Sequence, residues 1–392
     1  MPLSFRLTPA PVGRPLAAAA LALAALLAAG RPTHAQGTLG AQGLGYPPGQ
    51  MSASALATGG ATAEFDALSP LNEAAMLSSP ATTLHFQYAP EMRETQIGGE
   101  SSSSTVQRFP VFGIVGRVGA RLALGVHAST MLDRSWATVS TGQFMNNGAT
   151  VIYRDEVTST GAITDVRAAA AWRLAARLGV GMGVHVYTGE NRSEIVETFS
   201  DPAFTSFVQR TLVDYNGASL SGGVNWAPAR QLALAASGRA GGSLRLNSAD
   251  GTKLSRASVP TRAAAAAQYS GITGAVLAVR GEWQGWSSLD DLGTEDGLDA
   301  RNTWDLGVGA DVAGPRIGNS AVALRAGARL RDLPFAVDGS SVRETSFSGG
   351  LGLTLARGRV LLDLTAQRAS RDGPADASET GWTFSTGLAI RP

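Results

Sequence analysis

The chain has 392 residues, with 32 Lys and Arg against 31 Asp and Glu, and it contains no cysteine. This near-neutral balance gives no reason to expect nucleic acid as a partner, and the lack of cysteine excludes disulfides and thiol chemistry. Only 16% of the residues are charged and 48 are glycine, which is unusual for a soluble enzyme, where about a quarter of the residues are charged.

Residues 1–35 have the pattern of a Sec signal peptide. Arg6 and Arg14 precede an apolar run at 16–29, and a small-residue cleavage site follows at Ala35. The alternative is a membrane anchor, but a helix that spans the bilayer needs roughly 20 apolar residues. We therefore expect export, with cleavage after Ala35.

The next segment, residues 36–81, has no strand pattern. It is rich in Gly, Ala and Ser and has almost no charge before Glu64. It is too apolar for a solvated tail, so its place depends on the fold of the residues that follow.

From residue 82 onward, apolar residues alternate with small or polar ones, as in strands with two different faces. In residues 177–187, for example, leucine, valine and methionine fall on one face, whereas glycine, His185 and Tyr187 fall on the other. Ionisable residues stay opposite the apolar ones to the end of the chain. A soluble β-sandwich also shows this alternation, so the connections must decide.

Short and long connections alternate along the chain. Short turns are expected near 118–120, 175–177, 227–230, 270–271, 313–319 and 356–358, with longer polar loops between them, such as 98–105, 141–149, 200–207 and 287–300. Tryptophan and tyrosine on apolar faces at both strand ends predict two aromatic girdles. The pattern predicts an all-β fold, a transmembrane antiparallel up-and-down β-barrel of about 14 strands at residues 82–392.

One uncharged segment, residues 263–279, has two interpretations. Ser270-Gly271 at its centre predicts a hairpin of two strands. The alternative is a buried helix, because alanine favours helix.

A barrel of this size has a lumen that side chains alone do not fill. We therefore expect residues 36–81 to lie inside it as a plug. Gly59 and Gly60 permit a bend there, and Asp66 and Asn72 are expected to hold the plug by hydrogen bonds.

The run Gly59-Gly60-Ala61, then Asp66, then 69–74 resembles the N-terminal hatch of the long-chain fatty acid transporter family of outer-membrane barrels, the FadL-like (OMPP1/FadL/TodX) group. In that family a similar run plugs the lumen. Residues 344–369 also resemble the closing strands of FadL-like proteins and of the related PorV-type barrels. The chain departs from the family at Glu73, where the family has proline, and its last strand ends at residues 388–392 without the terminal aromatic residue that barrels of this kind usually have.

Catalysis would have to use His85, His127 or His185. An outer-membrane phospholipase needs such a histidine beside a nucleophilic serine, and no Gly-x-Ser-x-Gly elbow occurs. His127 and His185 are more simply polar groups of the wall. No His or carboxylate cluster has ligand spacing, so we expect no catalytic residue, no cofactor and no metal site.

Charged side chains on the inward faces also have two interpretations. They form a paired network that stiffens the wall and anchors the plug, or some arginines bind a substrate carboxylate. The candidates are Arg121, Asp165, Arg167, Arg173, Arg239, Arg262, Arg280, Glu282, Asp305, Asp311, Arg325, Arg329, Glu344 and Asp363.

An apolar ligand needs an apolar pocket. The candidates are plug residues, namely Leu56, Phe65, Leu68, Leu71 and Met76.

The resemblance implies an outer-membrane channel for passive uptake of hydrophobic small molecules, either fatty-acid-like or hydrocarbon. Its expected partners are that ligand, outer-membrane lipid and the barrel assembly machinery. The alternatives are a PorV-like or structural barrel that serves protein partners, and a general porin.

Overall fold

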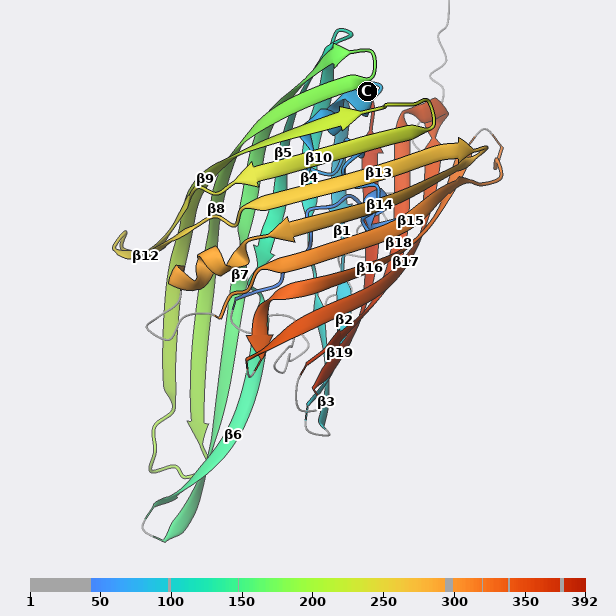
Figure 1. Cartoon of the computed structure of the whole chain (residues 1–392). Helices are drawn as coiled ribbons and strands as arrows, with labels where there is room; N and C mark the ends of the chain where they lie inside the picture. Colours follow the sequence, from blue (N-terminus) through green and yellow to red (C-terminus); the bar gives the residue numbers. More distant parts are fainter. Residues whose placement is uncertain are drawn as a thin grey trace, which may run out of the picture. The chain divides into compact units, whose positions relative to one another are not determined.

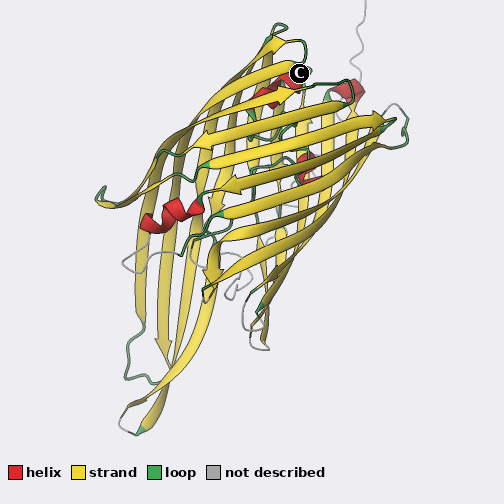
Figure 2. Cartoon of the chain, in the orientation of Figure 1, coloured by secondary structure: helices red, strands yellow, loops and turns green. Residues whose placement is uncertain are grey.

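The computed structural model describes residues 44–97, 100–146, 148–292, 299–318, 320–337, 339–373 and 377–392. The predicted signal peptide, 1–35, and the first part of the predicted plug, 36–43, lie outside the described residues. Strands make up most of the described chain, and a few short helices lie against them (Figure 2).

The strands are as follows. The first half of the barrel contains β1 Thr83–Tyr88, β2 Glu91–Ile97, β3 Glu100–Val106, β4 Val111–Val118, β5 Leu122–Asp133, β6 Trp136–Asn146, β7 Ala149–Ala175, β8 Leu178–Phe199 and β9 Phe207–Trp226. The second half contains β10 Leu232–Ala240, β11 Ser243–Ser248, β12 Lys253–Ser258, β13 Arg262–Ile272, β14 Ala275–Gln284, β15 Thr303–Ala313, β16 Ala321–Val337, β17 Ser340–Leu355, β18 Val360–Asp372 and β19 Ser378–Ile390. The short helices are α2 Ala53–Ala57, η1 Glu73–Ser78, η2 Trp286–Leu292 and η3 Ala356–Gly358.

All described strands belong to one antiparallel sheet that closes on itself. The first strand pairs with the last, with Leu84 opposite Ile390. Successive strands continue one another across a short break in the pairs β1 and β2, β3 and β4, β5 and β6, β10 and β11, and β12 and β13. The described residues therefore form a closed barrel of 14 strands, which confirms the predicted fold class. Closure pairs the backbone groups that an open edge would leave without partners in lipid.

Proline and glycine account for several of these breaks. Pro90, Pro110 and Pro260 lie between the strands that they separate, and Gly241-Gly242 separates β10 from β11. Proline has no amide hydrogen for the sheet, and glycine weakens a strand interior. The strand ladder is therefore interrupted at these positions, while the order of the strands around the barrel is kept.

The outer surface of the barrel is apolar. Large hydrophobic side chains, such as Leu124, Val184, Leu306 and Val308, are exposed there, while their strand neighbours point inward. Trp172 and Trp226 are exposed near the short turns, and Trp304 and Trp382 are exposed toward the other end. This distribution agrees with the predicted girdles. Among the described residues, no helix is long and apolar enough to cross a membrane.

The two ends of the barrel differ. At the short-turn end, successive strands are joined by a few residues, as between β7 and β8. At the long-loop end, β7, β8 and β9 have 27, 22 and 20 residues, about twice the 9–11 needed to cross a bilayer, and they project beyond their neighbours (Figure 1). Segments 98–105 and 141–149, expected as loops, are therefore largely strand. Both faces of such a projecting strand meet water, so the alternating pattern fades there.

The hairpin predicted for residues 263–279 is present as β13 and β14, and the helical alternative is wrong. Its turn is Thr273-Gly274, because Ile272 pairs with Ala275, and not Ser270-Gly271 as expected. Gly274 has φ +75°. This left-handed conformation suits glycine, so Gly274 sets the position of the turn.

Buried apolar residues form a core inside the barrel toward the long-loop end. It joins Leu44 and Tyr46 to wall residues such as Tyr187 and Phe335, and η2 contributes Trp286. Smaller apolar clusters lie around residues 51–71 and 76–77. The interior is therefore packed with protein along much of its length.

Candidate functional site: the barrel interior

Residues 44–81, here called the lumen segment, contact the inward faces of the strands. The blue trace of this segment runs within the ring of strands in Figure 1. Helix α2 contacts β16 to β19, and η1 contacts β4, β5, β7, β8 and β9. The segment therefore touches both sides of the wall.

Glu64 attaches the lumen segment to the wall through ion pairs. The carboxylate is fully buried and forms ion pairs with Arg262 and Arg280, the latter at 3.1 Å, and Ser237 Oγ donates a hydrogen bond to it at 2.6 Å. Burial opposes ionisation, but the two guanidinium groups outweigh it and hold the pKa of Glu64 below its usual value. Glu282 completes the group by pairing with both arginines.

A second attachment is formed by Asn72 and Glu73 at the start of η1. Asn72 is the N-cap of η1, where its side chain accepts from the amide of Ala74, and its Nδ2 donates to Asn225 Oδ1 at 2.7 Å. Glu73 is fully buried and pairs with Arg167 at 3.1 Å, and Ser221 also donates to it. The residue that departs from the FadL-like pattern therefore lies in an ion pair with the wall.

Tyr46 forms a third attachment, nearer the long-loop end. Its backbone pairs with Asp133, at 2.7 and 2.8 Å. Its hydroxyl donates to Glu344 at 3.0 Å and accepts from Arg371 at 3.0 Å. Four guanidinium groups, those of Arg93, Arg108, Arg331 and Arg371, lie within 5.0 Å of the ring centroid.

Glycines of the wall allow the lumen segment to approach closely. A Cβ at Gly327 would lie 2.1 Å from the carbonyl carbon of Thr58, and one at Gly309 would lie 2.2 Å from its oxygen. Neither distance is compatible with a side chain. Gly59 itself has φ +64°, and its amide donates to Ser348 Oγ at 3.1 Å. Residues 58–59 therefore rest directly on the backbone of β15 and β16.

The structure gives the predicted plug residues different surroundings. Gly59 and Gly60 both have positive φ, at a bend beside the wall, and Asn72 bonds to the wall. Asp66, in contrast, accepts hydrogen bonds, within the described part of the chain, from Ser52, Leu68 and Ser69, which all belong to the lumen segment. Asp66 therefore organises the segment internally.

The predicted ligand residues are mostly packed against protein. Leu56 and Leu71 share one buried cluster, and Met76 lies in another with Leu77. Leu68 is half-buried beside a cavity of only 10 Å³. Phe65 alone borders larger cavities, of 340 and 220 Å³.

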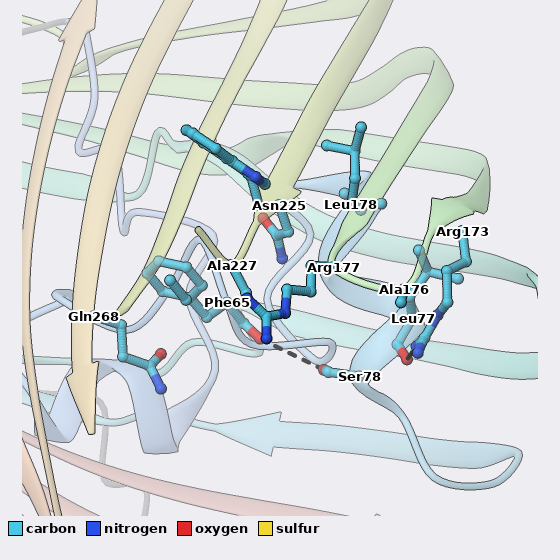
Figure 3. A pocket seen from close by; sticks show the side chains of 14 residues that line it. Phe65, Leu77, Ser78, Arg173, Ala176, Arg177, Leu178, Asn225, Ala227 and Gln268 are labelled. Atoms are coloured by element: carbon cyan, nitrogen blue, oxygen red, sulfur yellow. Dashed lines mark hydrogen bonds between the residues drawn. The ribbon is translucent and has the colours of Figure 1, made fainter. Parts of the chain in front are cut away.

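The 340 Å³ cavity lies at the short-turn end, between the lumen segment and the wall strands β7 to β10 and β13. Figure 3 shows side chains of the lumen segment (Phe65, Leu77 and Ser78) and of the wall (Arg173, Arg177 and Asn225) around it. Further lining comes from Ala176, Leu178, Gly179, Ala227, Ala233 and Gln268, and from Trp226, whose side chain is largely exposed at the outer surface. Its volume falls within the range of about 300–1,000 Å³ found for ligand pockets.

The predicted lumen charges mostly form a paired network. Arg325 bridges Asp311 and Asp363, Arg329 pairs with Asp305, and Arg331 and Arg371 share Glu344. Asp165 accepts from Gln50 at 3.0 Å, and His185 Nδ1 lies 2.8 Å from it. The structure separates Arg121 from this set, because it lies exposed in the turn between β4 and β5.

Sequence reasoning missed Tyr46, Glu64 and Glu73 as attachment points. A signal was present, since Glu64 and Glu73 are carboxylates in a segment poor in charge, while the predicted inward-facing charges of the wall comprise eight arginines and six carboxylates. Which arginine meets which carboxylate is a property of the folded barrel. Among the described residues, no group of His, Asp and Glu is arranged to hold a metal ion.

A closed antiparallel barrel with an apolar outer surface and a charged interior defines an outer-membrane-type β-barrel. Its solved neighbours give the fold more closely. A Pseudomonas aeruginosa FadL homologue is 13% identical over 88% of this chain and 99% of its own, with a TM-score of 0.63. The Ralstonia pickettii toluene transporter TbuX is 14% identical over 87% and 98%, with a TM-score of 0.58.

The monoaromatic hydrocarbon channel CymD is also similar, at 14% identity over 87% of this chain and 97% of its own, with a TM-score of 0.54. No family model matches the sequence, and no curated protein sequence matches it. The chain thus has the fold of the FadL-like hydrocarbon channels, as the resemblance in its N-terminal segment suggested. These three neighbours are described as a FadL homologue, a transporter and a channel, and none of them as an enzyme.

Proposed function

We propose that the protein is an outer-membrane channel for the passive uptake of hydrophobic small molecules and that residues 36–81 form its plug. The observation that carries the proposal is the buried attachment of the lumen segment to the wall through Glu64, Asn72 and Glu73 inside a barrel of this fold. Export by residues 1–35, insertion by the barrel assembly machinery and contact with outer-membrane lipid belong to the same proposal.

Passage requires the lumen segment to move. The cavities beside Phe65 give a small apolar molecule room at the short-turn end. Around Leu56 and Leu71 the side chains pack against one another. A ligand therefore binds at the segment and crosses after a local rearrangement of it, and not through a standing pore.

Two observations support this function over its alternatives. The segment and the apolar clusters occupy the interior, which disfavours a water-filled general porin. The solved neighbours named above are a transporter, a channel and a FadL homologue, which favours transport over a PorV-like barrel serving protein partners.

Growth on hydrophobic carbon sources tests the proposal. A strain without the gene is expected to grow more slowly on low concentrations of a fatty acid or an aromatic hydrocarbon as sole carbon source. The intact gene restores growth, and growth on a sugar is the control. Equal growth of the two strains on every hydrophobic substrate would overturn the channel function.

The short-turn end is expected to face the periplasm, as in outer-membrane barrels generally. In intact cells, a membrane-impermeant maleimide should label Ser103→Cys at the long-loop end and leave Arg230→Cys unlabelled. The native chain has no cysteine to give background. Labelling of Arg230→Cys alone would invert the topology.

A further inference from the structure

A series of hydrogen bonds connects Glu73 of the lumen segment to three strands of the wall. Asp165 of β7 lies 2.8 Å from Nδ1 of His185 on β8, and His185 Nε2 lies 2.7 Å from Oγ of Ser221 on β9. Ser221 in turn donates to the carboxylate of Glu73. Asp165, His185 and Glu73 are buried, and Ser221 is half-buried. These four side chains, here called the relay, therefore run from a carboxylate of the wall to a carboxylate of the segment.

The three contacts of the relay need three hydrogens. An ionised carboxylate only accepts, while a neutral imidazole and a hydroxyl donate one hydrogen each. With both carboxylates ionised, a neutral His185 and Ser221 supply two hydrogens, so one contact would bring two acceptors together. One additional proton completes the relay. The imidazole is the basic group between the two carboxylates, so this proton lies on His185, and both of its ring nitrogens then donate.

Asp165, His185 and Ser221 also have the order of a serine-hydrolase triad. In a triad the serine gives its hydrogen to the histidine, which acts as the base. Here the Ser221 hydroxyl donates to Glu73, and an ionised carboxylate has no hydrogen to return. The arrangement is therefore a link between segment and wall and not an activated nucleophile.

The charges around the relay show what retains the proton. Arg167 pairs with Glu73 at 3.1 Å, and Arg239 lies 3.6 Å from Asp165. These two guanidinium groups already balance the two carboxylates, so the hydrogen bonds of the relay, and not an excess of negative charge, retain the proton on His185. The groups that face the relay, as far as the structure describes them, are Asp165 and Arg167 on β7, Tyr187 on β8, Arg239 on β10, Gln50 and Glu73 of the lumen segment, and His127 on β5 beyond Arg167.

We infer, on the basis of the proposed plug, that docking of the lumen segment binds one proton at His185 and that loss of this proton releases Glu73 from Ser221. When the segment is undocked, Glu73 has left the relay, and His185 no longer needs a second donor. The docked state therefore binds one proton more than the undocked state. Docking is favoured at low pH and weakens as the pH rises, by up to about tenfold per pH unit for one proton.

The protonation state of His185 can be measured directly. We suggest solid-state NMR of the untagged mature barrel in lipid bilayers, labelled with 15N-histidine, because the ring nitrogen shifts distinguish an imidazolium from the two neutral tautomers. Three of the four histidines lie beyond residue 35, and the variant His185→Gln assigns the resonance. We expect an imidazolium at about pH 6.

Two conservative variants supply the third hydrogen without the added proton. In Glu73→Gln the amide donates to Ser221, which then donates to His185, so His185 should be neutral with its hydrogen on Nδ1. In Asp165→Asn the amide donates to Nδ1, so the hydrogen should lie on Nε2. Glu194→Gln, at an exposed position of β8, is the matched control and should keep the imidazolium. A neutral His185 in the native barrel, or an imidazolium that persists in Glu73→Gln, would overturn the inference.

Liposome swelling over a range of pH tests the link to docking. The permeability of the native barrel to small sugars should rise between about pH 5.5 and 8.5, where histidine commonly titrates. Glu73→Gln should be more permeable throughout, because its ion pair with Arg167 is lost, and should not respond to pH. A native permeability that stays constant while His185 titrates would show that the proton does not act on docking.

The NMR measurement does not depend on transport. A neutral His185 in the native barrel, together with slower growth of the deletion strain on hydrophobic carbon sources, would reject the proton site and leave the channel function standing. The expected imidazolium with equal growth of the two strains would reject the channel function and leave the proton site standing.

Discussion

Replacing Glu64 with Gln is expected to open the barrel to small solutes without unfolding it. The change removes the only carboxylate of the lumen segment that pairs with Arg262 and Arg280, as far as the described residues show. Breaking a buried ion pair on one side costs about 3–5 kcal/mol, and each 1.4 kcal/mol is about tenfold in an equilibrium. Glu64 is not part of the strand ladder. The lost free energy therefore weakens the docking of the lumen segment and not the barrel itself.

Liposome swelling with the purified barrel measures this effect. We expect Glu64→Gln to raise the permeability to small sugars at least about tenfold, toward that of a barrel lacking residues 36–79. Glu194→Gln is the matched control, because Glu194 forms an exposed ion pair with Arg210 on the projecting strands, and such pairs contribute little. Unchanged permeability of Glu64→Gln beside an open deletion variant would show that this ion pair does not hold the segment.

Gly327→Val is expected to open the barrel from the wall side. Its Cβ would lie 2.1 Å from the carbonyl carbon of Thr58, so the lumen segment must move away from β16. The backbone of Gly327 does not have the positive φ that would exclude valine, and a β-branched residue suits a strand. The barrel should therefore fold, while residues 58–59 of the lumen segment lose their contact with β16.

The control for this variant is Gly349→Val on the adjacent strand β17. A Cβ there meets its nearest neighbour, the carbonyl oxygen of Arg325, at 3.8 Å, which is ordinary contact. We expect single-channel conductance to rise in Gly327→Val and to stay at the native level in Gly349→Val. If both variants behave as the native protein, residues 58–59 do not close the lumen.

The barrel itself could be predicted from the sequence because the inward or outward direction of a side chain in a strand is a local property. Alternation in segments such as 177–187 assigned the faces, and the alternation of short and long connections gave the strand number. The ends of the projecting strands could not be predicted in this way. Both of their faces meet water, so β6 and the outer part of β7 resemble polar loop.

Only part of the candidate site could be predicted from the sequence. Gly59 and Asn72 were identified through the bend that glycine permits and the hydrogen bonds that asparagine makes in turns, which act within a few residues. Glu64 and Tyr46 were not, because their partners lie far along the chain, with Arg262 and Arg280 about 200 residues after Glu64 and Arg371 near the end of the chain. No local pattern connects such positions.

By itself, the sequence determined a closed membrane barrel with charges inside, since period-2 alternation and turn chemistry depend on near neighbours. The tertiary structure alone decided which arginines are neutralised and which are not. Closure of the barrel places Glu64 and Glu73 beside Arg262, Arg280 and Arg167 and leaves Arg173 and Arg177 at an open cavity. The reason is geometric, because ion pairing acts over a few ångströms and only the shared lumen brings groups so distant in the chain within that range.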